Sequence, residues 1–184
     1  MTSQTWPRLA ALAAASAATL ALLTGCGGTE SSDHPHPPGD AHVHIEGPTP
    51  ENADAGTAAK MALTAMFSWQ PMFDASTGAG LARAKPWLTG TLASSADEPP
   101  ATGIRPLAEW AAWRASLDIV TANVTVDQVD GDGDGDQQAL VRATVIQTVQ
   151  HTDGSATPYR VMNVTAAMDS TDDGWRLASY RVTG

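Results

Sequence analysis

The sequence predicts an α+β fold in which helices come first and a four-stranded antiparallel sheet follows. In residues 53–117, apolar side chains recur at spacings of three and four, which is typical of helices with one buried face. In residues 118–182, apolar and polar side chains alternate in four segments separated by short turns, which is the pattern of half-buried strands. Because short turns join neighbouring antiparallel strands, the four segments predict a meander.

Three helices are expected before the sheet. The first runs from about residue 53 to Trp69, where Pro71 should end it. A second, short helix spans residues 79–84 and stops before Pro86. The third begins at Pro106, a residue suited to a first helical turn, and places Leu107, Trp110, Trp113 and Leu117 on one face.

The strands are expected at residues 118–129, 138–152, 159–168 and 175–182. In the second strand, side chains alternate between two faces. The row on one face is Leu140, Arg142, Thr144, Ile146, Thr148 and Gln150. The row on the other face is Val141, Ala143, Val145, Gln147 and Val149. Turns rich in Asp and Gly separate the strands, so each strand should pair with the next along the chain.

Residues 1–25 have the order of a secretory signal peptide. Arg8 precedes an uncharged apolar run that extends from Leu9 to Leu23, and Thr24 and Gly25 follow it. A run of about 15 residues is short for a membrane span, which needs roughly 20. We therefore expect this segment to be removed.

The four residues Leu23, Thr24, Gly25 and Cys26 resemble the lipobox of bacterial lipoproteins. The resemblance implies that the Cys26 thiol receives a diacylglyceryl group, carrying chains such as palmitate, and becomes the first mature residue. Two acyl chains hold a protein stably on a membrane. The alternatives are a secreted protein with a chance cysteine and an uncleaved anchor.

Residues 26–52 form a tether without hydrophobic periodicity, and Pro35, Pro37 and Pro38 interrupt it. Four of the five histidines lie here, as the pairs His34, His36 and His42, His44. Residues two apart point the same way in an extended chain, so each pair can present two imidazoles to a divalent metal ion. The alternative is that polar residues simply fill a linker, and no other cofactor is expected.

Charge and cysteine content exclude several classes of function. The chain carries a formal net charge of −10, and removal of the signal, which contains Arg8 and no acid, makes it −11. Nucleic acids and anionic lipids are therefore disfavoured as partners. Cys26 is the only cysteine, so no internal disulfide can form and packing must stabilise the domain of residues 53–184.

The turn at residues 130–136 alternates Asp with Gly, as the first half of an EF-hand loop does. The bidentate Glu of that motif is absent, because Val141 occupies its place. A solvated turn and a weak cation site are both compatible with the pattern.

Two further groups of residues are candidates for a pocket or for chemistry. Four tryptophans, Trp69, Trp87, Trp110 and Trp113, can line a pocket for a small apolar ligand or can seat the helices on the sheet. The acids Asp74, Glu109 and Asp118 lie near apolar segments and can approach Arg83 or Arg114, either as catalytic groups or as ordinary ion pairs. His151 should be exposed in a turn beside Asp153, so no catalytic triad is predicted, and no residue is assigned a catalytic role.

Helices followed by this sheet, with Gly174, Trp175, Arg176 and Leu177 where the last strand begins, resemble the nuclear transport factor 2-like fold. That fold is a cone-shaped, cystatin-like roll with a curved sheet. The chain looks most similar to the Mce-associated proteins and to the envelope domains of conjugation machines, on Trp69, Pro71, Asp74, Arg83 and Trp87.

The resemblance implies a non-enzymatic binding or assembly module of a transport, secretion or conjugation system. It would be lipid-anchored on the extracytoplasmic face of the cell membrane and bound to an envelope protein. The alternatives are a small apolar ligand-binding lipoprotein and a hydrolase or isomerase that uses the cone.

Overall fold

The computed structural model describes residues 47–99, 107–131, 133 and 135–183. All of them belong to a compact unit that spans residues 44–184. The signal peptide, Cys26 and the four tether histidines lie outside the described residues, so their roles stay predictions. Within the described ranges, no helix combines the length and the apolar character needed to cross a membrane.

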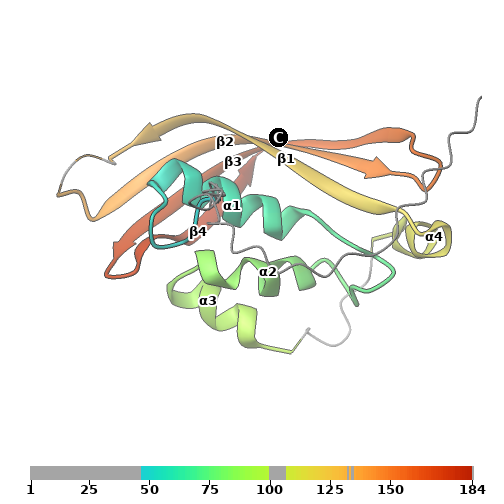
Figure 1. Ribbon diagram of the computed structural model, residues 1–184, viewed down its shortest axis with the longest axis horizontal. Helices are drawn as coiled ribbons and strands as arrows, with labels where there is room; N and C mark the ends of the chain where they lie inside the picture. Colours follow the sequence, from blue (N-terminus) through green and yellow to red (C-terminus); the bar gives the residue numbers. More distant parts are fainter. Residues whose placement is uncertain (1–46, 100–106, 132, 134, 184) are drawn as a thin grey trace, which may run out of the picture. The chain divides into compact units, whose positions relative to one another are not determined.

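The sheet has the predicted antiparallel order β1-β2-β3-β4. Its strands are β1 (Ile119–Asp130), β2 (Gln138–Gln150), β3 (Ala156–Thr171) and β4 (Gly174–Thr183). Each of the three pairings contains one register shift, and a shift of this kind bends and twists the strands. The helices α1, α2 and α3 lie on one side of this curved sheet, which confirms the α+β prediction (Figure 1).

Helix α1 (Ala55–Phe67) packs on the inner face of the sheet through very small side chains. Its first turn is capped by Asp54, whose Oδ1 accepts a hydrogen bond from the Thr57 backbone N–H at 2.6 Å. Four alanines of this helix are fully buried in the core that it shares with the strands: Ala55, Ala58, Ala59 and Ala62. The helix ends at Phe67, close to the predicted end before Pro71.

The segment after α1 confirms one predicted helix and contains two elements that were not predicted. Helix α2 (Ala79–Ala84) has the predicted bounds, and a 3₁₀ turn, η1 (Lys85–Trp87), follows it. Helix α3 (Gly90–Asp97) was not predicted from the sequence. It buries none of its residues, so it lacks the apolar periodicity by which helices are recognised.

Helix α4 (Trp110–Ser116) begins four residues later than predicted. The residues before it form a turn, in which the Trp110 backbone N–H donates to the Leu107 carbonyl at 3.1 Å. Leu117 ends the helix with a φ of 61°, in the left-handed region. It is 54% exposed and therefore does not share the buried face of Trp110 and Trp113, contrary to the prediction.

Strand β2 turns one of its two rows of side chains toward the core, and this inward row contains a single polar residue. All five side chains in it are at most 5% exposed: Val141, Ala143, Val145, Gln147 and Val149. Four of them are apolar and fill the core. Gln147 is 0% exposed and is the exception to the alternation of apolar and polar residues.

Close packing of α1 against α2 requires Gly80. A Cβ atom on this residue would lie 2.2 Å from the Met66 carbonyl oxygen, well inside van der Waals contact. We predict that Gly80→Ala lowers the free energy of unfolding by about 1–3 kcal/mol, because the two helices must separate. Urea denaturation measures the change.

Gly78→Ala is the matched control, since its Cβ would meet only the Ser76 hydroxyl, at 3.3 Å. Equal unfolding free energies for the two variants would show that the contact between α1 and α2 does not need a glycine.

Candidate functional site

Two arginines hold the loop that follows α1. The Asp74 carboxylate forms an ion pair with Arg83, with 2.6 Å between Oδ1 and Nη1. The Arg83 Nη2 also donates to the Ser68 carbonyl at 2.5 Å. Arg114, from α4, donates to the carbonyls of Pro71 at 2.7 Å and of Asp74 at 2.9 Å. We call Asp74, Arg83 and Arg114 the arginine clamp.

The clamp fixes a loop whose tip is apolar and exposed. A tight turn brings the Phe73 and Asp74 backbone N–H groups to the Gln70 carbonyl, at 2.8 and 2.7 Å. At the tip, Phe73 is 83% exposed and Met72 is 52% exposed. Aromatic residues and methionine are enriched in the cores of protein interfaces, so Phe73 and Met72 are candidate contacts for a partner.

The structure separates the three acids that the sequence singled out. Asp74 forms an ion pair with Arg83 through Oδ1, one of the two roles that the sequence left open for it. Its Oδ2 accepts a hydrogen bond from the Gln70 backbone N–H at 2.7 Å. Glu109 is exposed at the start of α4. Asp118 is 6% exposed and lies at the junction of α4 and β1. These acids do not converge on one catalytic centre.

Asp118 belongs to a chain of hydrogen bonds that the sequence did not predict. Its Oδ1 lies 3.1 Å from Nδ1 of His151, and Nε2 of His151 lies 2.8 Å from the Thr157 hydroxyl. His151 is half-buried between the two and not exposed in a turn as expected, because the β2–β3 hairpin folds back on the α4–β1 junction. The order acid, imidazole, hydroxyl is that of a catalytic triad.

A triad also needs a substrate cleft and donors that stabilise an oxyanion. Asp118, His151 and Thr157 are absent from the linings of five cavities among the described residues. The Ser116 hydroxyl donates to Asp118 at 2.7 Å and, with the interaction with His151, lowers the pKa of that carboxyl. The network ties the hairpin to α4.

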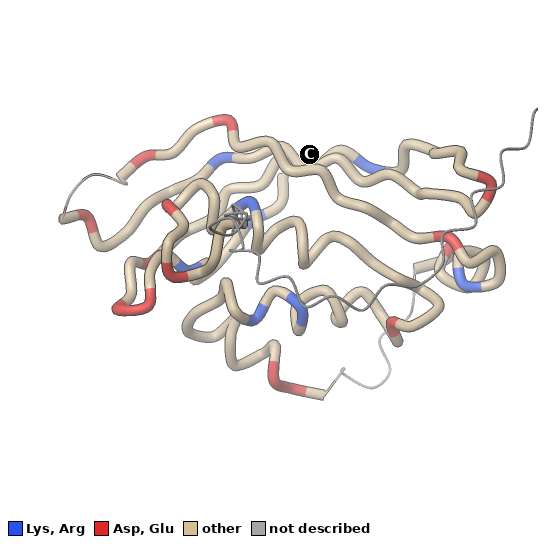
Figure 2. The backbone as a smooth tube through the Cα atoms, in the orientation of Figure 1, with Lys and Arg blue, Asp and Glu red and all other residues tan. Residues whose placement is uncertain are grey.

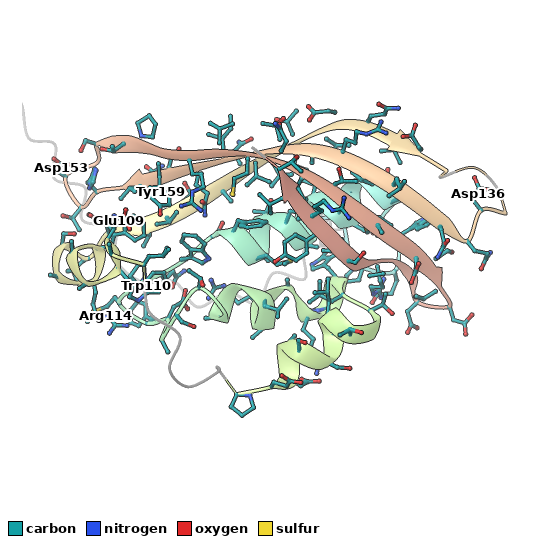
Figure 3. All side chains as sticks on the ribbon, turned by 180° about the vertical axis from the view of Figure 1, so that it is seen from behind. Glu109, Trp110, Arg114, Asp136, Asp153 and Tyr159 are labelled. Carbon is teal, nitrogen blue, oxygen red and sulfur yellow. The ribbon has the colours of Figure 1, made fainter. Side chains whose placement is uncertain are left out.

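The predicted pocket tryptophans lie in two places. Trp87 is part of the main core beneath the sheet. Trp69, Trp110 and Trp113 form a second cluster with Val120 and Val149, which we call the tryptophan cluster. Tyr159 stacks edge-on against Trp113 with ring centroids 4.9 Å apart. Figure 3 shows Trp110 and Tyr159 at the end of the sheet away from Asp136. Trp110 and Trp113 thus seat α4 on β1 and β2.

A cavity of about 340 Å³ opens between the end of α1, helices α2 and α3, and the inner face of the sheet. Trp69 lines it, and the other three tryptophans do not. Its lining is mostly apolar with a few polar groups: Met66, Phe67, Trp69, Thr77, Gly78, Leu81, Leu92, Leu107, Gln147, Arg160, Met162 and Tyr180. This size is at the low end of the range for small-molecule sites.

Gln147 lies in the wall of this cavity and carries a buried polar atom that has no partner among the described residues. Its Nε2 donates to the Phe67 carbonyl at 2.7 Å, which assigns the orientation of the amide. Its Oε1 is buried, and no donor among the described residues reaches it. A buried amide oxygen without a partner costs about 1–3 kcal/mol. The sequence held a signal for this residue, because Gln147 falls in the inward row of β2.

A larger hollow of about 520 Å³ lies between α1 and the edge strand β1. It is open to solvent, and no buried unpaired group was found in its lining among the described residues. In those same residues, no group of three His, Cys, Asp or Glu side chains is arranged to hold a metal ion. Asp and Glu positions gather on hairpin turns and loops (Figure 2).

No known family model matches the chain, and no curated protein is detectably similar to it in sequence. Among solved structures, CagV of Helicobacter pylori, a VirB8 homologue of a type IV secretion system, is 9% identical with a TM-score of 0.45. That comparison covers 70% of this chain and 95% of CagV. VirB8 of Agrobacterium tumefaciens is 7% identical with a TM-score of 0.40, covering 75% of this chain and 95% of VirB8.

The intermembrane space region of the chloroplast protein ARC6 is also similar, with 17% identity and a TM-score of 0.37. It covers 72% of this chain and 98% of that region. All three TM-scores lie below 0.5.

We predict that Asp118→Asn lowers the melting temperature at pH 7. The folded state favours the charged carboxylate, since its pKa is lowered mainly by the Ser116 hydroxyl and further by His151, and these effects exceed the opposing ones of burial and of the nearby Asp153. The stabilisation is therefore present above the ordinary carboxyl pKa of about 4 and is lost as the pH falls through the lower folded-state value. Thermal melts of both proteins from pH 7 to pH 3 should show the difference shrinking. A difference that stays constant over that range would contradict the assignment.

Proposed function

We propose that this chain is a lipid-anchored envelope protein whose roll is a non-enzymatic docking module for a protein partner. The partner belongs to a transport, secretion or conjugation assembly on the extracytoplasmic face of the membrane. The observation that carries the proposal is the exposed Phe73, presented on a loop that the arginine clamp fixes.

Rigid presentation favours binding. An exposed aromatic side chain on a flexible loop loses conformational entropy when it docks, whereas a loop that is already ordered avoids most of that cost. Five hydrogen bonds from Arg83, Arg114 and the Gln70 backbone N–H hold this loop. Burial of a phenylalanine side chain in a partner's pocket contributes about 1.5–3 kcal/mol.

A hydrolase or isomerase is the less favoured function. Both oxygens of Asp74 already accept hydrogen bonds, so this carboxylate is not poised to take a proton from a substrate. Asp118 is likewise engaged by Ser116 and His151. The buried carboxylates therefore stabilise loops and junctions of the fold.

The anchor is tested by intact-mass analysis of the membrane fraction. We expect the mature chain to begin at Cys26 and to carry a diacylglyceryl group, because residues 23–26 match the lipobox. Cys26→Ser should abolish both the added mass and the cleavage before residue 26. An unmodified cysteine in membrane-held protein would contradict the anchor.

Phe73→Ser tests the docking surface. We predict that this variant loses a partner that co-purifies with the wild-type chain from gently solubilised membranes. The loss of about 1.5–3 kcal/mol corresponds to affinity weakened roughly ten- to a hundredfold. Quantitative mass spectrometry of the co-purified proteins measures the effect.

Val161→Ser is the matched control, since Val161 is an apolar residue that is 63% exposed on β3, away from the loop. It should leave the partner bound. Arg114→Gln retains Phe73 but removes clamp hydrogen bonds, so it should give an intermediate loss. Equal retention of the partner by all three variants would contradict the proposal.

A further inference from the structure

We propose that the cavity beside Gln147 binds a small amphiphilic acid, namely a short acyl chain whose carboxylate lies next to a hydrogen-bond donor such as a 2-hydroxyl. The proposal does not involve Phe73 and is independent of the docking function. It rests on the unpaired amide oxygen, on the cation beside it and on the apolar walls.

The unpaired Oε1 of Gln147 favours a ligand that carries a hydrogen-bond donor. Gln147 is 0% exposed, and its Nε2 is committed to the Phe67 carbonyl, so the side chain cannot turn its oxygen toward water without losing that bond. A ligand hydroxyl or amide N–H would satisfy Oε1 and remove the cost of leaving it unpaired. An all-hydrocarbon ligand would leave that cost in place.

The guanidinium of Arg160, which also lines the cavity, favours a ligand with a negative charge. Arg160 on β3 pairs with Gln147 in the register of the sheet, so the two side chains start side by side on the same face. Its Cζ lies 5.2 Å from the centroid of the Tyr159 ring, and no acid among the described residues forms an ion pair with it. None of the lining residues of the cavity is acidic.

These two neighbours define a head group in which an anionic acceptor and a donor sit on adjacent atoms. A 2-hydroxy carboxylate has this arrangement: the carboxylate meets the Arg160 guanidinium and the hydroxyl donates to Gln147. Planar guanidinium groups bind carboxylates through paired hydrogen bonds. A simple carboxylate would satisfy only Arg160.

The remaining walls fit a short apolar chain. Met66, Leu81, Leu92 and Met162 contribute aliphatic side chains to the cavity. The Gln147 oxygen is shielded from solvent, so a ligand reaches it only after a wall side chain moves. Methionine side chains adapt readily in this way, and two of them lie in the wall. A volume of about 340 Å³ limits the ligand to a small acid.

Calorimetric titration of the full chain in phosphatidylcholine nanodiscs tests the proposal, with empty nanodiscs as the blank. We expect 2-hydroxyoctanoate to bind with a sub-millimolar Kd and octanoate to bind about tenfold more weakly, since one hydrogen bond is missing. Gln147→Met retains the shape of the side chain without the amide, so it should abolish the difference between the two acids. Arg160→Gln should weaken both by about tenfold or more.

Arg181→Gln is the control for charge, because Arg181 does not line this cavity. It should leave both Kd values unchanged. Thermal melts of each variant confirm that it is folded, and Arg160→Gln supplies a test on an exposed residue if Gln147→Met unfolds the chain. Failure of both acids to bind the wild-type chain at about 1 mM would overturn the proposal, as would equal weakening by Arg160→Gln and Arg181→Gln.

Discussion

The close approach of α1 to the sheet is the constraint on which the rest of the structure depends. Alanines at positions 55, 58, 59 and 62 are all 0% exposed and belong to the core that the helix shares with the strands, so small side chains fill this part of the helix surface. The helix fills that face only as far as Phe67. The sheet extends further, and the space beyond the helix is occupied partly by the tryptophan cluster and partly by the cavity.

The end of α1 also determines where the loop emerges. The backbone pairs with β1 directly after the helix, with hydrogen bonds of 2.8 and 2.9 Å between Trp69 and Val120. Pro71 then turns the chain outward, and the arginine clamp holds it with Phe73 at the tip. One short segment thus supplies a wall of the cavity through Trp69 and an exposed surface through Phe73. The two sites share a support but use different residues.

Much of the fold could be predicted from the sequence because local patterns determine it. Alternation along residues 138–152 identified β2 and its buried row, and Pro86 marked the end of α2 near Ala84.

The predicted start of α4 was wrong because the turn at Leu107 has the same spacing of apolar residues as a helix. Helix α3 was not predicted because it buries no residue and so shows no apolar periodicity. Asp74 was expected near Arg83 or Arg114, and it contacts both. The unpaired oxygen of Gln147 and the Asp118–His151 contact depend on residues distant in the chain, so no local pattern contains them.

We propose that the loop around Phe73 is the surface on which a protein partner docks. Site-specific photo-cross-linking in intact cells tests it most directly, with a photoreactive amino acid in place of Phe73 and, in a separate variant, in place of Val161. Both positions are exposed, at 83% and 63%, so accessibility alone does not distinguish them. For a docking surface at Phe73, we predict one defined protein adduct from position 73 and none from position 161. No adduct from position 73, or the same adducts from both positions, would contradict it.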